Sequence, residues 1–194
     1  MSALKLVVGI SGASGAPYAA RLIELLAKLP AEQVQVAVCL SRTAPQTWGL
    51  EVGTDLEKLP FPVYRGRDYD APFASGSAGW HAMVIVPCSM SQVARVANGI
   101  SDDLLTRAAD VMLKERRKLV LVARESPYSR IHLQNMLTVT DAGAIVLPAS
   151  PSFYARPESV RDLIDTVVGR VLDHVGLDVG IVKRWGSEND AGAR

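Results

Sequence analysis

Glycines and small hydroxyl residues gather in the segment Ser11–Gly15, which directly follows an apolar run. Gly9, Gly12 and Gly15 are spaced three residues apart, and a stretch with helical periodicity comes next. A glycine loop that opens a helix presents backbone amides to an anion, and the helix dipole favours negative charge there. The pattern therefore predicts a phosphate-binding loop. The same residues are also compatible with a plain tight turn between a strand and a helix.

This loop departs from the two familiar nucleotide-binding motifs. It lacks the lysine of a Walker A loop, and Ile10 stands where the dinucleotide fingerprint has its first glycine. The second predicted strand ends in Ser41-Arg42, without an acidic residue to hold a ribose diol. These departures favour a mononucleotide such as FMN over NAD.

Two groups of charged residues could act on such a ligand. Arg124 and Glu125 directly follow an apolar run, and charged residues on the loop after a buried strand often serve function. Arg107, Asp110 and Lys114 fall near one helix face at spacings of three and four. Such spacing is also typical of a surface ion-pair ladder, which is the simpler interpretation of this second group.

The elements that position these residues alternate along the chain. Branched apolar runs predict strands at 5–10, 34–40, 82–86, 119–123 and 144–147. Helical periodicity predicts helices at 16–29, 43–51, 92–98, 104–114, 130–140 and 159–175, and residues 53–79 predict long loops around a short strand. The alternation predicts an α/β domain, with helices on both faces of an open parallel sheet. Ligands bind such a sheet at the carboxyl ends of its strands.

Composition limits the classes of function. The 194 residues carry a formal net charge of +1, which gives no support to a nucleic-acid partner. No apolar run approaches the length of a membrane span and no signal peptide is evident, so we expect a cytoplasmic protein without membrane contact. Cys39, Cys88 and the three histidines lack metal-ligand spacing, so no metal is expected. We expect a single domain over residues 1–186 and a frayed tail at 187–194.

The order and spacing of these segments resemble the UbiX-type flavin prenyltransferases from Gly9 to about Trp185. The matching segments include Gly9–Gly15, Ser75–Ser77, Pro87–Met90, Arg107–Val111, Leu113–Arg117, Arg124-Glu125 and Phe153-Tyr154. The resemblance implies a flavodoxin-like or Rossmann-like fold and a homo-oligomer, often a dodecamer, that binds FMN between subunits. It also implies transfer of a dimethylallyl group from dimethylallyl phosphate to N5 and C6 of reduced FMN. The prenylated FMN would be delivered to a UbiD-type decarboxylase.

The resemblance further implies roles for individual positions. The catalytic residues would be Ser14, Lys114, Glu125 and Tyr154. FMN would contact Gly12, Ala13, Ser14, Ser41, Ser89, Met90, Ser91, Gln92 and Arg124. The prenyl phosphate would meet Lys114, Arg124, Glu125, Tyr154 and Arg170, and the pocket would be completed by Ser75, Gly76, Ser77, Arg107 and Trp185.

Some positions depart from the family pattern, and other functions stay open. Gln92 replaces a common threonine, Ala123 a common proline and Asp103 a common asparagine, while Tyr69 stands at an aromatic position that is often tryptophan. One alternative is an FMN-dependent cysteine decarboxylase, but the histidine that it needs is absent from residues 44–51. Another is a non-catalytic flavin-binding subunit of an aromatic-acid decarboxylase. The sequence leaves open whether the donor is a monophosphate or a diphosphate, and whether the pathway is ubiquinone synthesis or aromatic-acid metabolism.

Overall fold

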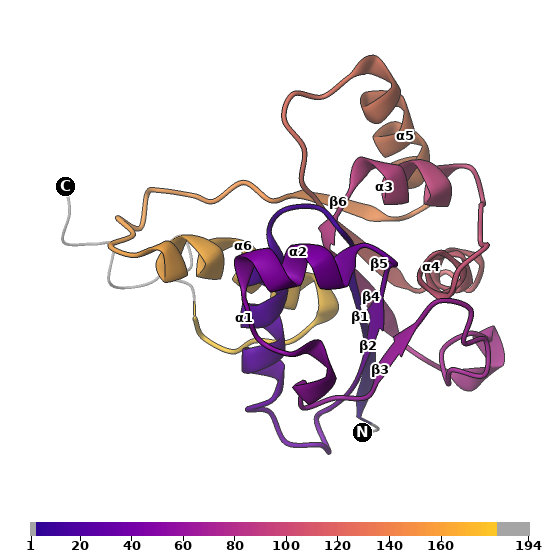
Figure 1. The fold of residues 1–194 in the computed structure, drawn as a ribbon, viewed down its shortest axis with the longest axis horizontal. Coiled ribbons are helices and arrows are strands. Elements are labelled where there is room, and N and C mark those ends of the chain that lie inside the picture. Colours follow the sequence, from indigo (N-terminus) through magenta and orange to yellow (C-terminus); the bar gives the residue numbers. More distant parts are fainter. Residues whose placement is uncertain (1–2, 182–194) are drawn as a thin grey trace.

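The computed structural model describes residues 3–181 and has a six-stranded sheet between two layers of helices (Figure 1). The strands are β1 (Leu4–Ile10), β2 (Val34–Leu40), β3 (Val63–Arg65), β4 (Ala82–Cys88), β5 (Lys118–Ala123) and β6 (Ile145–Pro148). The helices are α1 (Ala16–Leu26), α2 (Ala44–Glu51), α3 (Met90–Ala97), α4 (Leu104–Lys114), α5 (Arg130–Asp141) and α6 (Val160–Val175). Two 3-10 turns, η1 (Leu56–Lys58) and η2 (Gly76–Ala78), flank β3.

The strand order is β3-β2-β1-β4-β5-β6, and every neighbouring pair is parallel. This is the order of Rossmann-type sheets, in which the direction of winding reverses between β1 and β4. Loops that follow these two strands leave toward opposite faces and open a crevice at the carboxyl edge of the sheet. The predicted fold class is confirmed, and the glycine loop lies at this crevice because it follows β1.

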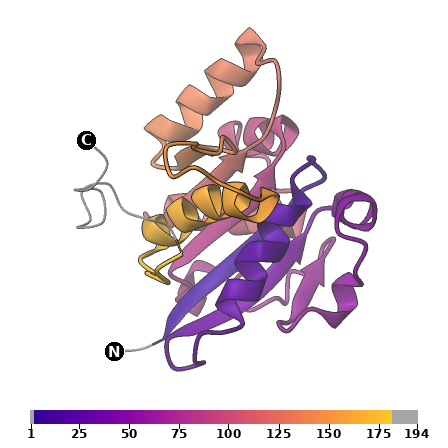
Figure 2. The ribbon, with the colours of Figure 1, turned by 90° about the vertical axis from the view of Figure 1, so that its left-hand side faces the viewer.

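The core forms because side chains along each strand alternate between the two helical layers. Leu6 and Val8 of β1 pack with α1 and α6, whereas Val7 between them packs with α3 and α4. Figure 2 shows α1 and α6 side by side across one face of the sheet. Arg21 of α1 holds Asp165 of α6 through two hydrogen bonds of 2.6 and 3.0 Å, which fixes α6 against the helix that opens at the glycine loop.

The predicted elements are confirmed, with small shifts at their ends. The first helix ends at Leu26 rather than residue 29, because Pro30 disfavours helical geometry in the residue before it and the turn closes early. The third helix begins at Met90, two residues earlier than predicted, because Ser89 caps it by accepting from the Gln92 amide. A three-residue strand, β3, lies in the long loop region as expected. The predicted tail and Trp185 lie outside the described residues.

Helix α5 stands beyond the carboxyl edge of the sheet in both views (Figures 1 and 2). Its Val139 is buried, but Ile131, Leu133 and Leu137 are 71%, 53% and 54% exposed. The helix therefore carries apolar surface on the side away from its own domain. Across residues 3–181, no helix combines the length and apolar character that a membrane span requires.

Candidate functional site

Ser11 ties together the loops that follow β1 and β4. Its buried hydroxyl donates to the carbonyl of Pro87 at 2.7 Å and accepts from the amide of Ser89 at 3.0 Å. The amide of Ala13 also approaches the Ser11 oxygen, at 3.4 Å. Ser11 is thus the residue that holds the glycine loop beside the start of α3, a role that sequence spacing did not predict.

Gly12 is required by the close approach of α2. A Cβ atom at this position would lie 2.1 Å from Oγ1 of Thr43, which no side chain can tolerate. The Thr47 hydroxyl then donates to the carbonyl of Gly12 at 3.0 Å, and Oγ of Ser41 lies 3.4 Å from Oγ1 of Thr43. The expected contact residues Gly12 and Ser41 therefore meet where the loops after β1 and β2 come together.

Glu51, the last residue of α2, occupies the N-terminus of α1. Its Oε2 accepts from the amides of Gly15 and Ala16, both at 2.8 Å, and its carboxylate also hydrogen-bonds the Ser14 side chain. Burial raises the pKa of this carboxyl, but these hydrogen bonds and the charge of Arg124 outweigh it and hold the pKa below its ordinary value. The sequence predicted a phosphate at this helix end, yet two of its amides already bind the chain's own carboxylate. Sequence spacing gave no signal for Glu51, since it lies 37 residues beyond Ser14.

Arg124 follows β5 and lies at the same edge of the sheet. Its amide donates to the carbonyl of Cys88 at 3.1 Å, and its charge acts on both Glu51 and Tyr18. Burial raises the pKa of Tyr18, and the positive charge of Arg124 partly opposes this. Glu125 instead accepts from the Ser126 amide at 3.0 Å. Within the described part of the chain, Glu125 forms no ion pair with Arg124 or any other residue.

The first turn of α3 supplies the remaining expected FMN contacts. Ser89 and Ser91 place their hydroxyls 3.0 Å apart, and Met90 is buried beneath them. Gln92 is only 7% exposed, and its Oε1 is fully buried without a hydrogen-bond partner. One chain thus brings all nine expected FMN-contact residues to the carboxyl edge.

A cavity of about 700 Å³ opens beside this turn. Ser41, Thr43, Ser91 and Gln92 line one side of it. Its charged lining consists of Arg42, Arg65, Arg67, Arg95, Asp102 and Asp103. Arg95 forms an ion pair with Asp102, but the arginines outnumber the aspartates, so the cavity favours an anionic ligand.

Lys114 and the Ser75–Ser77 segment, which were also expected at the pocket, lie at the opposite edge of the sheet. Lys114 ends α4, four residues before β5 begins, and pairs with Glu115 at 2.5 Å. Arg124 follows β5, whose six residues span roughly 20 Å. One chain therefore does not bring Lys114 together with Arg124, although the family resemblance implied that both residues meet the prenyl phosphate.

The Ser75–Ser77 segment joins Lys114 at the amino edge. The carbonyl of Gly76 accepts from Arg117 at 2.7 Å, and the Glu115 side chain packs so closely on Gly76 that a Cβ there would meet Oε1 at 2.1 Å. Arg107 donates to the carbonyl of Ala74, just before this segment, at 3.1 Å. It also pairs with Asp110 at 3.3 Å, as the ion-pair interpretation of this helix face expected.

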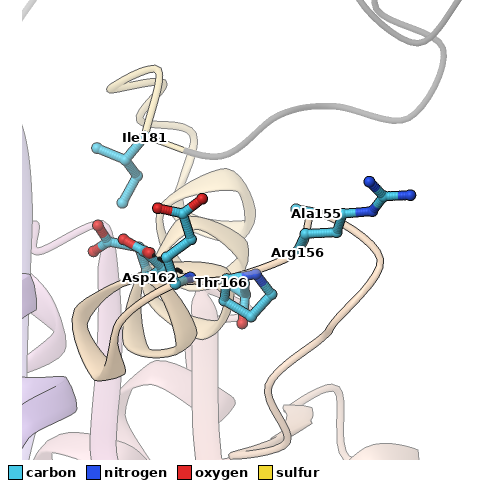
Figure 3. A pocket seen from close by; sticks show the side chains of 8 residues that line it. Ala155, Arg156, Asp162, Thr166 and Ile181 are labelled. Carbon is cyan, nitrogen blue, oxygen red and sulfur yellow. Dashed lines mark hydrogen bonds between the residues drawn. The ribbon is translucent and has the colours of Figure 1, made fainter. Parts of the chain in front are cut away.

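The segment between β6 and α6 carries Tyr154, which is 62% exposed. Arg170 lies on the exposed face of α6 and pairs with Asp173 at 2.9 Å. A cavity of about 270 Å³ lies between this segment and α6, and Figure 3 shows Arg156 pointing away from Asp162 beside it. Three acidic side chains line this cavity, namely Glu158, Asp162 and Asp165. Arg156 also lines the cavity, and Asp165 is already paired with Arg21 of α1.

Neither metal ligands nor reactive thiols appear in the described structure. Among residues 3–181, no group of three or more histidine, cysteine or acidic side chains is arranged to hold a metal ion. Cys39 and Cys88 are free and buried. Burial raises the pKa of both thiols, so they stay protonated and inert at neutral pH.

Comparison with known proteins identifies relatives over most of the chain. Residues 1–172 match the family model for the Flavoprotein family. The chain is 44% identical to Flavin prenyltransferase UbiX of Methanocaldococcus jannaschii, with 95% of this chain and 100% of that protein covered. It is 47% identical to Flavin prenyltransferase UbiX of Deinococcus radiodurans, with 93% of each chain covered.

Solved structures similar to this chain include proteins of the same UbiX type. AnUbiX, crystallised with FMN and dimethylallyl pyrophosphate, superposes with a TM-score of 0.90 at 43% identity, covering 95% of this chain and 98% of that one. A dodecameric FMN-dependent UbiX-like decarboxylase from Escherichia coli gives a TM-score of 0.89 at 41% identity, covering 94% and 100%. The FMN-dependent cysteine decarboxylase SpaF shares the fold alone, with a TM-score of 0.61 at 17% identity over 86% of this chain and 96% of that one. Sequence and structure together place this chain in the UbiX family of flavin prenyltransferases.

Proposed function

We propose that this protein transfers a dimethylallyl group from dimethylallyl phosphate to reduced FMN. The observation that carries the proposal is the similarity over nearly the whole chain to enzymes named for this activity, at 44% and 47% identity. In the transfer, the C1–O bond of the donor breaks and phosphate leaves with its electron pair, while N5 of the flavin bonds to C1 and loses a proton. Ring closure at C6 then requires a proton added to the alkene and a proton removed from C6.

The carboxyl edge fits a flavin mononucleotide. Its cavity of about 700 Å³ has the size of a cofactor site. The cationic side chains of Arg42 and Arg67 suit the phosphate, and the hydroxyl of Ser41 can donate to it. The loop at Gly12 leaves no space for a side chain because Thr43 packs directly against it, which fixes the loop beside α2.

Because the Glu51 carboxylate hydrogen-bonds the Ser14 side chain, these two residues are the ones placed to transfer protons. The Glu51 carboxylate is ionised at neutral pH because its pKa is held low, and it hydrogen-bonds the Ser14 side chain. A carboxylate in this arrangement can accept a proton that passes through the serine hydroxyl. Arg124, whose charge already acts on Glu51, can stabilise the negative charge of the departing phosphate. Glu125 and Tyr154 keep the roles in proton transfer and donor binding that the family resemblance implies.

A second copy of the chain would complete the site. Lys114 and the Ser75–Ser77 segment lie at the amino edge, so only a neighbouring subunit can bring them to Arg124. The exposed apolar residues of α5 support association, since a helix rarely leaves so much apolar surface in water. The relative from Escherichia coli is dodecameric, and we propose the same assembly here. Light scattering that found an active monomer of 20.8 kDa would exclude it.

The product would be delivered to a UbiD-type decarboxylase, and the expected cytoplasmic location stays a prediction. The decisive experiment incubates the purified protein with reduced FMN and dimethylallyl phosphate without oxygen, followed by mass spectrometry of the released flavin. We expect the flavin to gain one dimethylallyl unit, and a parallel reaction with dimethylallyl pyrophosphate compares the two donors. Unchanged flavin in both reactions would favour a non-catalytic flavin-binding subunit. In a separate reaction with oxidised FMN as the electron acceptor, loss of CO₂ from a peptide that ends in cysteine would favour a cysteine decarboxylase.

A further inference from the structure

Glu115 connects two parts of the amino edge, Lys114 and the Ser75–Ser77 segment. Its Oε1 accepts a hydrogen bond from Nζ of Lys114 at 2.5 Å. The same oxygen lies so close to Gly76 that a Cβ atom added there would meet it at 2.1 Å. One carboxylate oxygen therefore touches both the Lys114 ammonium group and the middle residue of the segment.

Arg117 fixes the same carboxylate against the backbone of the segment. Its guanidinium donates to the carbonyl of Gly76 at 2.7 Å and lies 3.7 Å from Oε2 of Glu115. Each oxygen of Glu115 thus has a cationic neighbour, which limits the rotation of the carboxylate. Ser75 and Ser77 are exposed on either side of the buried Gly76, with their hydroxyl oxygens 3.0 Å apart. The segment therefore presents two hydroxyl groups from a backbone that is held in place.

The contact with Glu115 leaves Lys114 able to bind an anion. An ammonium group has three N–H donors, and the hydrogen bond to Glu115 uses one of them. Because the Lys114 side chain is 46% exposed, a ligand can reach the others. The hydrogen bond from Lys114 also holds the pKa of Glu115 below its ordinary value, so the carboxylate is ionised at neutral pH. A lysine that is already held by a partner loses less rotamer freedom when it binds a phosphate.

We propose that Glu115 is a positioning residue that holds Lys114 and the Ser75–Ser77 segment in one arrangement, so that a neighbouring subunit's site receives both together. Position 76 is a glycine because the Glu115 carboxylate occupies the space of its side chain. The family resemblance implied roles for Lys114 and for the segment, but none for Glu115. The inference rests on the proposed function, in which Lys114 meets the phosphate of the prenyl donor.

The test measures steady-state prenylation by the whole protein at saturating reduced FMN while the concentration of dimethylallyl phosphate is varied. Glu115→Ala should raise the KM for the donor about tenfold, as expected for one lost hydrogen bond between charged groups, and change kcat less than about twofold. A merely structural role would instead lower the melting temperature and kcat and leave the donor KM unchanged, which would overturn the proposal.

Two conservative variants separate the geometry of Glu115 from its charge. Glu115→Gln keeps the length and an acceptor oxygen, so it should raise the donor KM by only about threefold. Glu115→Asp keeps the charge but is one methylene shorter, so its oxygen no longer spans from Gly76 to Lys114. We expect it to raise the donor KM as much as Glu115→Ala does. An aspartate variant with the wild-type donor KM would overturn the proposal.

Gly76→Ala tests the contact itself. Its methyl group would displace the Glu115 carboxylate, so this variant alone should also raise the donor KM about tenfold. The three atoms nearest to the added methyl group, Cγ, Cδ and Oε1, all belong to Glu115 and are absent from Glu115→Ala. In that background Gly76→Ala should therefore cause no further loss, because both changes remove the same contact. Losses that multiply in the double variant would overturn the proposal.

Gly49→Ala is the matched control for a glycine substitution, since its Cβ would meet nothing within 4 Å, and it should keep the wild-type donor KM. The wild-type reaction distinguishes the two possible failures. If wild-type protein formed no prenylated flavin, the proposed function itself would fail. If wild-type protein were active and Glu115→Ala had the same donor KM, only the role of Glu115 would be refuted.

Discussion

Replacing Glu51 with glutamine tests whether a single carboxylate both caps helix α1 and accepts a proton in the prenyl transfer. Glutamine keeps the shape and one acceptor oxygen, so the amides of Gly15 and Ala16 retain a partner. It removes the negative charge at the positive end of the helix. It also removes the base that hydrogen-bonds Ser14.

The expected loss of stability follows from the two amide bonds of 2.8 Å. A hydrogen bond to a charged group contributes roughly 1 kcal/mol more than one to a neutral group, which gives about 2 kcal/mol for the pair. Glu51 is exposed, so solvent screening reduces this to about 1 kcal/mol. For a chain of this length, that corresponds to a fall in melting temperature of about 2–4 °C.

The pH dependence of the melting temperature separates the contribution of the Glu51 charge from that of its side-chain shape. Because the folded state lowers the pKa of Glu51 below its ordinary value of 4.5, its charge stabilises the protein above that value. The stabilisation is lost as the pH falls through the lower pKa of the folded state. The difference in melting temperature between wild type and Glu51→Gln should therefore be present at pH 7 and shrink below about pH 4.

Scanning calorimetry across this pH range measures stability, and anaerobic stopped-flow absorbance measures prenylation. We expect the rate of Glu51→Gln to fall by about 10²-fold or more, since general-base catalysis typically contributes that much. Glu32→Gln, at an exposed position before β2, is the control and should change neither quantity. A melting difference that is equal at pH 7 and pH 3, together with a wild-type rate, would refute the reasoning.

Three further predictions concern Glu125, Gly12 and the independence of the reaction from metal ions. Glu125→Gln should bind FMN with wild-type affinity but form product about 10²–10⁴-fold more slowly in rapid-mixing spectra; product at the wild-type rate would leave Glu125 without a catalytic role. Gly12→Ala should reduce FMN affinity strongly in a fluorescence titration because its Cβ would lie 2.1 Å from Thr43, whereas Gly49→Ala, which meets nothing within 4 Å, should bind FMN normally. Activity should persist in EDTA, and activity that EDTA abolished and magnesium restored would contradict a metal-independent reaction.

The sequence was sufficient to predict the fold because its strands are continuous apolar runs separated by clear helical periods. Strand β2 and helix α4 begin and end at the predicted residues. The errors lie at helix ends, where a capping hydroxyl such as that of Ser89 decides the boundary by one hydrogen bond. Periodicity carries no information about such a bond.

Only part of the candidate site could be predicted from the sequence. Residues that directly follow a strand, such as Ser41 and Arg124, could be placed because parallel strands end at one edge. Glu51 could not, since its role depends on the tertiary packing of α2 against the glycine loop. Motif order also placed Lys114 beside Arg124, because a linear pattern does not distinguish which edge of the sheet a residue occupies.

The length of β5 between Lys114 and Arg124 has a genetic consequence. If each site joins the carboxyl edge of one chain to the amino edge of another, two inactive variants can complement each other. A chain with Ser14→Ala and a chain with Lys114→Ala, unfolded and reassembled together, would form some interfaces that combine two intact edges. Each variant alone would form none, so activity would reappear only in the mixture, and a harmful allele of one kind could be masked by an allele of the other.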